Sequence, residues 1–282
     1  MTARIIALID GSTYSKSICE NAAWIAKRTG ATVELVHVLG RRETASSDLS
    51  GTIALGARSS LLAELSSLDE ERARLAQKRG RAILEDAQAM LAEAGVEASM
   101  RLRNGDLLET VAEAEKQADI IVIGKRGEGA DFAKLHLGSN LERIVRSATR
   151  PVYVAARAWR PVEKVLIAHD GGPSIGRAVD HIARSELFSA LDIRLLAVGA
   201  DTAEHRRRLA DAEAVLKAGG HQATSRLVQG QPDRVIAEIV EKDGIDLLVM
   251  GAYGHSRIRS MIIGSTTTEM IRACKIPILL FR

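Results

Sequence analysis

The segment Asp246-Leu-Leu-Val-Met-Gly251-Ala-Tyr-Gly254 joins an apolar, strand-like run to two closely spaced glycines. Nine further residues separate Gly254 from Gly264-Ser-Thr, which opens an amphipathic, helix-like stretch. A strand, a glycine-rich loop and a helix start together gather main-chain N–H groups that can hold a phosphate. The segment therefore predicts a nucleotide site.

The pattern occurs again in the first half, where Asp119-Ile-Ile-Val-Ile leads into Gly124-Lys-Arg-Gly127 and ten residues precede Gly138. Other segments repeat in the same order, so a duplicated domain explains the 282 residues better than a solenoid of short units. We place the domains at residues 1–158 and 159–282. The matching pairs are Ile5–Ser12 with Val165–Gly172, Val33–Val38 with Ile193–Val198, and Met100–Gly105 with Ser225–Gly230.

Each half alternates five strand signals with four helical ones, which predicts an α/β fold with a parallel sheet covered on both faces. The apolar runs are continuous, as expected for strands buried on both sides. The expected helices are Ser15–Thr29, Asp69–Ala94, Leu107–Gln117 and Asn140–Ser147, then Ser174–Phe188, Asp201–Ala218, Asp233–Lys242 and Thr266–Ala273. Gly95 and Gly219 stand where glycines that end helices are expected.

Composition narrows the class of protein. Apolar content is 46% and the apolar runs are far shorter than a membrane span, so we expect neither a membrane protein nor a signal peptide. Only Cys19 and Cys274 are present, which fits a reducing cytoplasm and supplies no metal-ligand spacing. A net charge of +3 and 3% aromatic residues argue against a nucleic-acid partner.

The two halves differ most at residues 41–68, a serine- and glycine-containing segment that has no counterpart in the second half. The first interpretation is that this segment is a surface loop. The alternative is a lid or a partner contact, because a loop that leaves the second strand lies near the carboxyl ends of the strands, where open α/β sheets bind ligands.

These motifs resemble those of the universal stress protein family, in its tandem two-domain form, over nearly the whole chain. The resemblance implies two five-stranded parallel sheets of order 3-2-1-4-5, on the adenine-nucleotide hydrolase-like fold, paired through their last strands as a pseudo-dimer. It also implies that ATP binds at the ends of strands one and four. The implied site residues are Asp170, Val198, Gly251, Gly254, His255, Gly264, Ser265 and Thr266, and more weakly Asp10, Val38, Gly124, Gly127, Gly138, Ser139 and Asn140.

Physical chemistry supports the same roles. Glycines at 251 and 254 can adopt positive φ and leave room for a ligand. Ser265 and Thr266 offer hydroxyls and free N–H groups at a helix start, which favours an anion. Tyr253 and His255 would flank the base or the phosphates, although His255 would equally suit an exposed loop.

Other nucleotide and enzyme motifs fit less well. A P-loop sequence is absent, and Gly124-Lys-Arg-Gly127 lacks the Rossmann spacing. Gly172-Pro-Ser174-Ile-Gly176 matches a nucleophile elbow, but two sets of five strands do not make one hydrolase sheet. We expect Ser174 to cap a helix, as Ser12 or Ser15 would in the first half. The six other histidines lack ligand spacing.

The sequence therefore predicts a cytoplasmic, ATP-binding stress sensor or regulator, with Mg²⁺ held only through the phosphates and at most slow ATP hydrolysis. A nucleotide hydrolase or transferase on the same fold, and a scaffold without nucleotide, remain alternatives. We expect an intrachain pseudo-dimer, with a homodimer left open and the regulatory partner unidentified. The longer, more acidic loop of the first half predicts tighter binding by the second.

Overall fold

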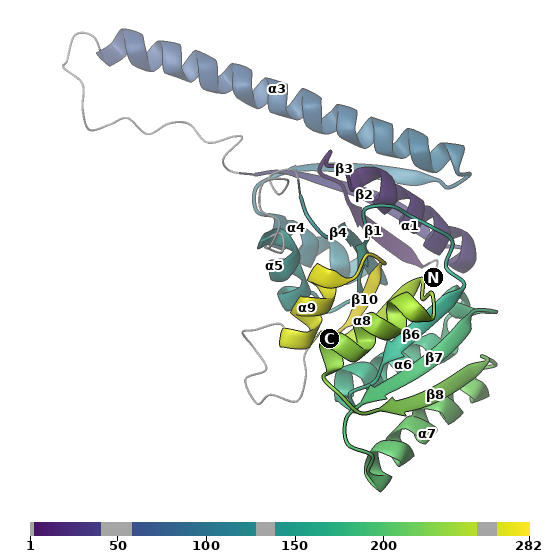
Figure 1. The fold of residues 1–282 in the computed structure, drawn as a ribbon. Coiled ribbons are helices and arrows are strands. Elements are labelled where there is room, and N and C mark those ends of the chain that lie inside the picture. The colour runs from purple at the N-terminus through teal and green to yellow at the C-terminus, as the bar shows by residue number, and fades with distance from the viewer. Residues whose placement is uncertain (1–2, 41–57, 128–138, 253–263) are drawn as a thin grey trace.

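The structure is a computed structural model, and it describes residues 3–40, 58–127, 139–252 and 264–282 (Figure 1). The first half contains β1 (Arg4–Leu8), α1 (Ser15–Thr29), β2 (Thr32–Leu39), α3 (Arg58–Glu93), β3 (Ala98–Asn104), α4 (Leu107–Ala114), β4 (Ile120–Gly124), α5 (Ser139–Ser147) and β5 (Val152–Ala155). The second half contains β6 (Lys164–Ala168), α6 (Pro173–Arg184), β7 (Asp192–Val198), α7 (Ala203–Ala218), β8 (Ala223–Val228), α8 (Pro232–Lys242), β9 (Leu247–Gly251), α9 (Ser265–Ala273) and β10 (Ile278–Phe281). The predicted alternation of strands and helices is confirmed.

All ten strands form a single sheet in the order β3-β2-β1-β4-β5-β10-β9-β6-β7-β8. Each half has the predicted order 3-2-1-4-5, and neighbouring strands within a half run parallel. The halves meet where β5 and β10 pair antiparallel, with Tyr153 opposite Leu279. The predicted pairing of the two halves through their last strands is confirmed.

Buried side chains form one cluster on each face of the sheet, as expected when strands are apolar on both sides. The first cluster packs α1, α3, α6 and α7 against the sheet. The second packs α4, α5, α8 and α9 against the opposite face. Both clusters include residues of β5 and β10, so the core continues from one half into the other.

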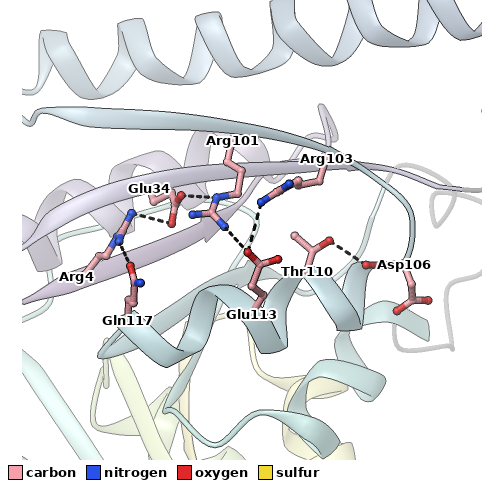
Figure 2. A network of polar contacts seen from close by, with 8 residues as sticks. All are labelled: Arg4, Glu34, Arg101, Arg103, Asp106, Thr110, Glu113 and Gln117. Atoms are coloured by element: carbon pink, nitrogen blue, oxygen red, sulfur yellow. Dashed lines mark hydrogen bonds and ion pairs between the residues drawn. The ribbon is translucent and has the colours of Figure 1, made fainter.

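Ion pairs link α4 to β3, the strand at the edge of the sheet (Figure 2). The Glu34 carboxylate on β2 is buried and lies 3.2 Å from the guanidinium of Arg4 and 2.6 Å from that of Arg101. Arg101 also lies 3.8 Å from Glu113 of α4. The corresponding β7 position carries the opposite charge, because Arg194 pairs there with two aspartates. Both halves therefore have an ion pair at this position, but the strand residue is acidic in the first half and basic in the second.

Three local predictions about helix starts are wrong, and the first two concern α3 and α6. The helix expected from Asp69 begins at Arg58, so residues 58–68 are helical rather than a loop. The leucine, alanine and glutamate of this stretch are strong helix formers and outweigh the neighbouring serines. Ser174 does not cap α6, which begins at Pro173 with Gly172 at the N-cap position. Proline suits the first helical position because its missing N–H would have no partner there.

Neither serine near α1 caps that helix. Tyr14 holds the N-cap position and its side chain makes no capping hydrogen bond. The Ser15 hydroxyl accepts a hydrogen bond from the Gly11 amide at 3.1 Å, and the Ser12 hydroxyl accepts one from the Tyr14 amide at 3.3 Å. Both serines therefore stabilise the turn before the helix.

Candidate functional site

A cavity of about 300 Å³ opens at the carboxyl ends of β6, β7 and β9, between the start of α9 and the start of α8. Its volume lies at the lower end of the range for small-molecule sites. Six residues that the sequence predicted for the second half line this one cavity: Asp170, Val198, Gly251, Gly264, Ser265 and Thr266. Residues up to 96 positions apart in the chain are thus brought together as expected, although what the cavity binds stays a prediction.

Asp170 sits in a tight turn directly after β6. Its Oδ1 accepts a hydrogen bond from the Gly172 amide at 2.8 Å, and Gly171 between them has φ 75°. A side chain at Gly171 would be strained at that φ, and its Cβ would lie 2.7 Å from the Arg208 guanidinium. The Asp-Gly pair thus fixes the direction in which the chain leaves the strand, at the edge of the cavity.

The start of α9 is fastened to the end of β9. The Thr267 hydroxyl donates to the Gly251 carbonyl at 3.0 Å, and the Gly264 amide donates to the Ala252 carbonyl at 3.3 Å. The next amides, those of Ser265 and Thr266, lie in the first turn of the helix, where N–H groups have no acceptor within the helix. They are placed at the cavity wall, where the helix dipole favours an anion.

The expectation of positive φ is wrong for Gly251, and Gly264 does not use positive φ either, while Gly254 lies outside the described residues. Gly264 has φ −54°, and Gly251 is absent from the described glycines with positive φ. Any residue can adopt these backbone conformations. What the two glycines provide is the lack of a side chain at the cavity wall.

Apolar side chains that were not predicted from the sequence form another part of the wall. Leu196 and Met250 come from β7 and β9, and Pro232 and Ile236 come from α8. A helix that packs on a sheet shows apolar residues for that reason alone, so no signal distinguished the two α8 residues from core residues. The segment that leads into α8, Gly230-Gln-Pro, lies at the same edge of the sheet, and only the folded structure shows this.

His169 also lines the cavity, beside Asp170. Burial lowers the pKa of His169 below 6.5, the Asp170 carboxylate opposes that shift, and Arg208 adds to it. The imidazole is therefore neutral at neutral pH. His169 is one of the histidines without ligand spacing, and its position beside a predicted site residue was the only signal in the sequence that could have singled it out.

The corresponding residues of the first half lie in a more filled environment. Asp10 repeats the turn of Asp170, since its Oδ1 accepts from the Ser12 amide at 2.9 Å. A Cβ placed on Gly124 would lie 2.8 Å from the Cβ of Tyr14. One placed on Gly127 would lie 2.9 Å from Oδ2 of Asp10. Tyr14 and Asp10 thus occupy space next to the two glycines.

The remaining first-half candidates lie on the expected elements. Val38 is partly buried on β2, on the same face of the sheet as Val198 of β7. Ser139 begins α5, and Asn140 is exposed in its first turn. Gly138, Gly254 and His255 lie outside the described residues, as does Tyr253.

Lys125, which lies between Gly124 and Gly127 in the first-half motif, does not add its charge to the first-half site. Its side chain is buried, and Nζ donates a hydrogen bond to the main-chain carbonyl of Cys274 at the end of α9. Burial lowers the pKa of Lys125 to about 8. Lys125 therefore connects the two halves of the molecule.

Among the residues that the structure describes, no cluster of three or more His, Cys, Asp or Glu side chains could hold a metal ion. None of the described helices combines the length and the apolar character that a membrane span requires.

Comparison with known proteins gives consistent results. The family model described as the universal stress protein family matches residues 1–156 and again residues 161–282. A universal stress protein of Synechocystis sp. is 35% identical over 284 aligned residues, which cover 99% of both chains. One of Mycolicibacterium smegmatis is 23% identical and covers 99% of this chain and 96% of its own.

Among solved structures, a universal stress protein from Archaeoglobus fulgidus superimposes with a TM-score of 0.69 at 21% identity. The match covers 98% of this chain and 95% of that one, and it shows the shared fold. The two family matches, the full-length relative and the duplicated sheet lead to the same assignment. The chain belongs to the universal stress protein family and carries the family domain in tandem.

Proposed function

We propose that the second half of this protein binds an adenine nucleotide, ATP in the first instance, and that the protein acts as a stress-response sensor or regulator. One observation carries the proposal: the described residues of the glycine motif and the aspartate after β6 line a single cavity. Family resemblance points to ATP, because ATP-binding members share this glycine spacing.

The cavity suits the parts of such a ligand. Leu196, Val198, Ile236 and Met250 offer apolar surface for the adenine ring. The amides and hydroxyls of Ser265 and Thr266 would hold phosphates at the start of α9. Asp170 would accept hydrogen bonds from the ribose or the base. Mg²⁺ would then be held through the phosphates, since the described residues offer no metal cluster of their own.

A nucleotide hydrolase is the second candidate, and His169 is the observation that favours it. A neutral imidazole at the cavity wall can accept a proton from an attacking water. Against this, Oδ1 of the neighbouring Asp170 already accepts a hydrogen bond from the Gly172 amide, so this oxygen is not available to orient the imidazole. We therefore propose binding with, at most, slow hydrolysis.

Calorimetric titration of the full chain with ATP and Mg²⁺, followed by a steady-state ATPase assay, tests these readings. Binding with turnover far below about 1 per second supports the regulator, because ordinary enzymes turn over at about 1–10³ per second. Turnover in that range, reduced by His169→Gln without loss of ATP affinity, would establish the hydrolase. If the protein binds no adenine nucleotide, the conclusion would be that it is a scaffold without nucleotide.

A further inference from the structure

The long helix α3 packs on the body of the protein through only part of its length. It spans Arg58–Glu93, and its buried side chains are Leu84, Ala87 and Leu91, which lie against α1 and the sheet. Of the side chains that the structure describes between positions 61 and 79, none is buried. The N-terminal part of α3 projects past the end of the sheet (Figure 1).

This projecting part carries a row of exposed leucines. Leu61, Leu68 and Leu75 are 36%, 54% and 57% exposed, and they are spaced seven residues apart. Residues at that spacing lie on one face of a helix, as residues at one of the two apolar heptad positions do in a seam between two helices. They make up half of the large hydrophobic side chains that are exposed in the described residues, so the patch is concentrated rather than scattered.

The charges of the same part are separated along the helix. Residues 64–71 include four acidic side chains and no basic one: Glu64, Asp69, Glu70 and Glu71. Residues 72–81 include five basic side chains and no acidic one: Arg72, Arg74, Lys78, Arg79 and Arg81. Two such helices in parallel would set like charges side by side, whereas an antiparallel pair sets each acidic block beside a basic block.

We propose that the leucine face of α3 binds the same face of a second copy of this chain, with the two helices antiparallel. Placing Leu68 opposite Leu75 of the second copy puts the twofold axis between residues 71 and 72. The same register brings Leu61 opposite Ala82 and Glu64 opposite Arg79. The contacts of the leucine rows then extend over residues 61–82, about 33 Å at 1.5 Å per residue.

The rest of the molecule is compatible with this arrangement. Each body packs on the C-terminal third of its own helix, so the two bodies lie at opposite ends of the helix pair. The strands β5 and β10, which join the halves, already pair within the chain. The α3 contact therefore adds an interface that is separate from the sheet and from the cavity.

Sedimentation velocity of the full chain over a concentration series tests the association. We expect a dimer for the wild type and a monomer for Leu68→Glu/Leu75→Glu. Gln77→Glu is the matched control, because Gln77 is exposed on the opposite side of the same helix and should leave the dimer intact. Circular dichroism of the variants checks that α3 remains helical. A wild type that stays monomeric, or a dimer that the double variant leaves intact, would overturn the proposal.

Disulfide trapping tests the orientation. Leu68→Cys and Leu75→Cys should cross-link when the two single variants are mixed, and neither should cross-link by itself. The native Cys19 and Cys274 are buried, and burial raises the pKa of both thiols, so they will compete little. Cross-linking of each variant with itself would show a parallel pair and would contradict the antiparallel register.

Discussion

At the scale of single residues, Gly264 matters for the side chain that it lacks. It lines the cavity at the point where α9 begins, and its φ of −54° imposes no need for glycine. Any effect of a substitution there will therefore come from filled space rather than from backbone strain.

We predict that Gly264→Val lowers ATP affinity at least ~100-fold, or about 2.8 kcal/mol at 1.4 kcal/mol per tenfold change. The branched side chain would narrow the cavity beside the first amides of α9. Gly176→Ala is a suitable control, because Gly176 is exposed on α6 with no atom near its would-be Cβ. Titration calorimetry on folded protein measures the difference, and unchanged affinity in Gly264→Val would place the nucleotide elsewhere.

His169 predicts how stability depends on pH. Burial lowers its pKa in the folded protein, so the unfolded chain binds the proton more readily. The stabilising contribution is fully present above the unfolded pKa of about 6.5 and is lost as pH falls toward the lower folded value. We expect the free energy of unfolding of the wild type to fall more than that of His169→Gln between about pH 7.5 and 5.5. Urea denaturation at both pH values measures this, and parallel losses would contradict the assignment.

At the scale of elements, Gly219 sets how closely α6 and α7 approach. The sequence placed it at the end of a helix, and α7 does end at Ala218, but the φ of Gly219 is −75° and it is Gly220 that adopts the left-handed conformation, with φ 84°. A Cβ at Gly219 would lie 2.2 Å from the main-chain oxygen of Ala183 in α6. Close packing against a neighbouring backbone, rather than helix termination, is what requires a glycine at this position.

Two alanine substitutions should therefore change stability in opposite directions. Gly219→Ala should lower the free energy of unfolding by about 1–3 kcal/mol, because the clash is with backbone atoms that cannot turn aside. Gly176→Ala, in the exposed face of α6, should raise it by about 0.5–1 kcal/mol through the better helix propensity of alanine. Thermal or urea unfolding measures both, and a neutral Gly219→Ala would mean that α6 and α7 can move apart freely.

The elements could be predicted where local pattern and tertiary packing agree. The helix expected at Ser15–Thr29 has those bounds, because its apolar positions face the core and Gly30 ends it at φ 65°. Residues 58–68 were missed because none of their described side chains is buried, so helix propensity rather than packing sets their structure. The polar residues of the site followed from the motif. Pro232 and Ile236 did not, because only the fold brings α8 over the cavity.

At the scale of the whole molecule, duplication covers two sheet edges that would otherwise be open to pairing with other chains. The apolar strands β5 and β10 protect each other in the middle of the sheet, where their residues are buried. The strands left at the two edges, β3 and β8, are largely polar on their accessible positions, with Arg101 and Arg103 on one and Arg226 on the other. Charged side chains on edge strands discourage pairing with other sheets.

The two halves share a fold but differ at the ends of their fourth strands. The Asp-Gly turns match closely, with φ 76° at Gly11 and 75° at Gly171. Four residues after each aspartate, however, the first half has Tyr14 and the second half has Ser174. Tyr14 packs against Gly124, while the matching Gly251 lines the open cavity of the second half. A bulky ring thus stands beside the first-half glycine where the second half keeps room for a ligand.

We therefore predict one nucleotide per chain, bound by the second half. Spacing points the same way, since one extra residue separates Gly127 from Gly138 and changes how the Gly-Ser helix start is presented. Calorimetry on the full chain should give a stoichiometry of one, which Gly264→Val removes and the matched Gly138→Val leaves unchanged. Working on the full chain avoids exposing the apolar β5 and β10 edges that separated domains would present. A stoichiometry of two, or binding that survives Gly264→Val and disappears in Gly138→Val, would show that the filled space beside Gly124 opens to admit a ligand.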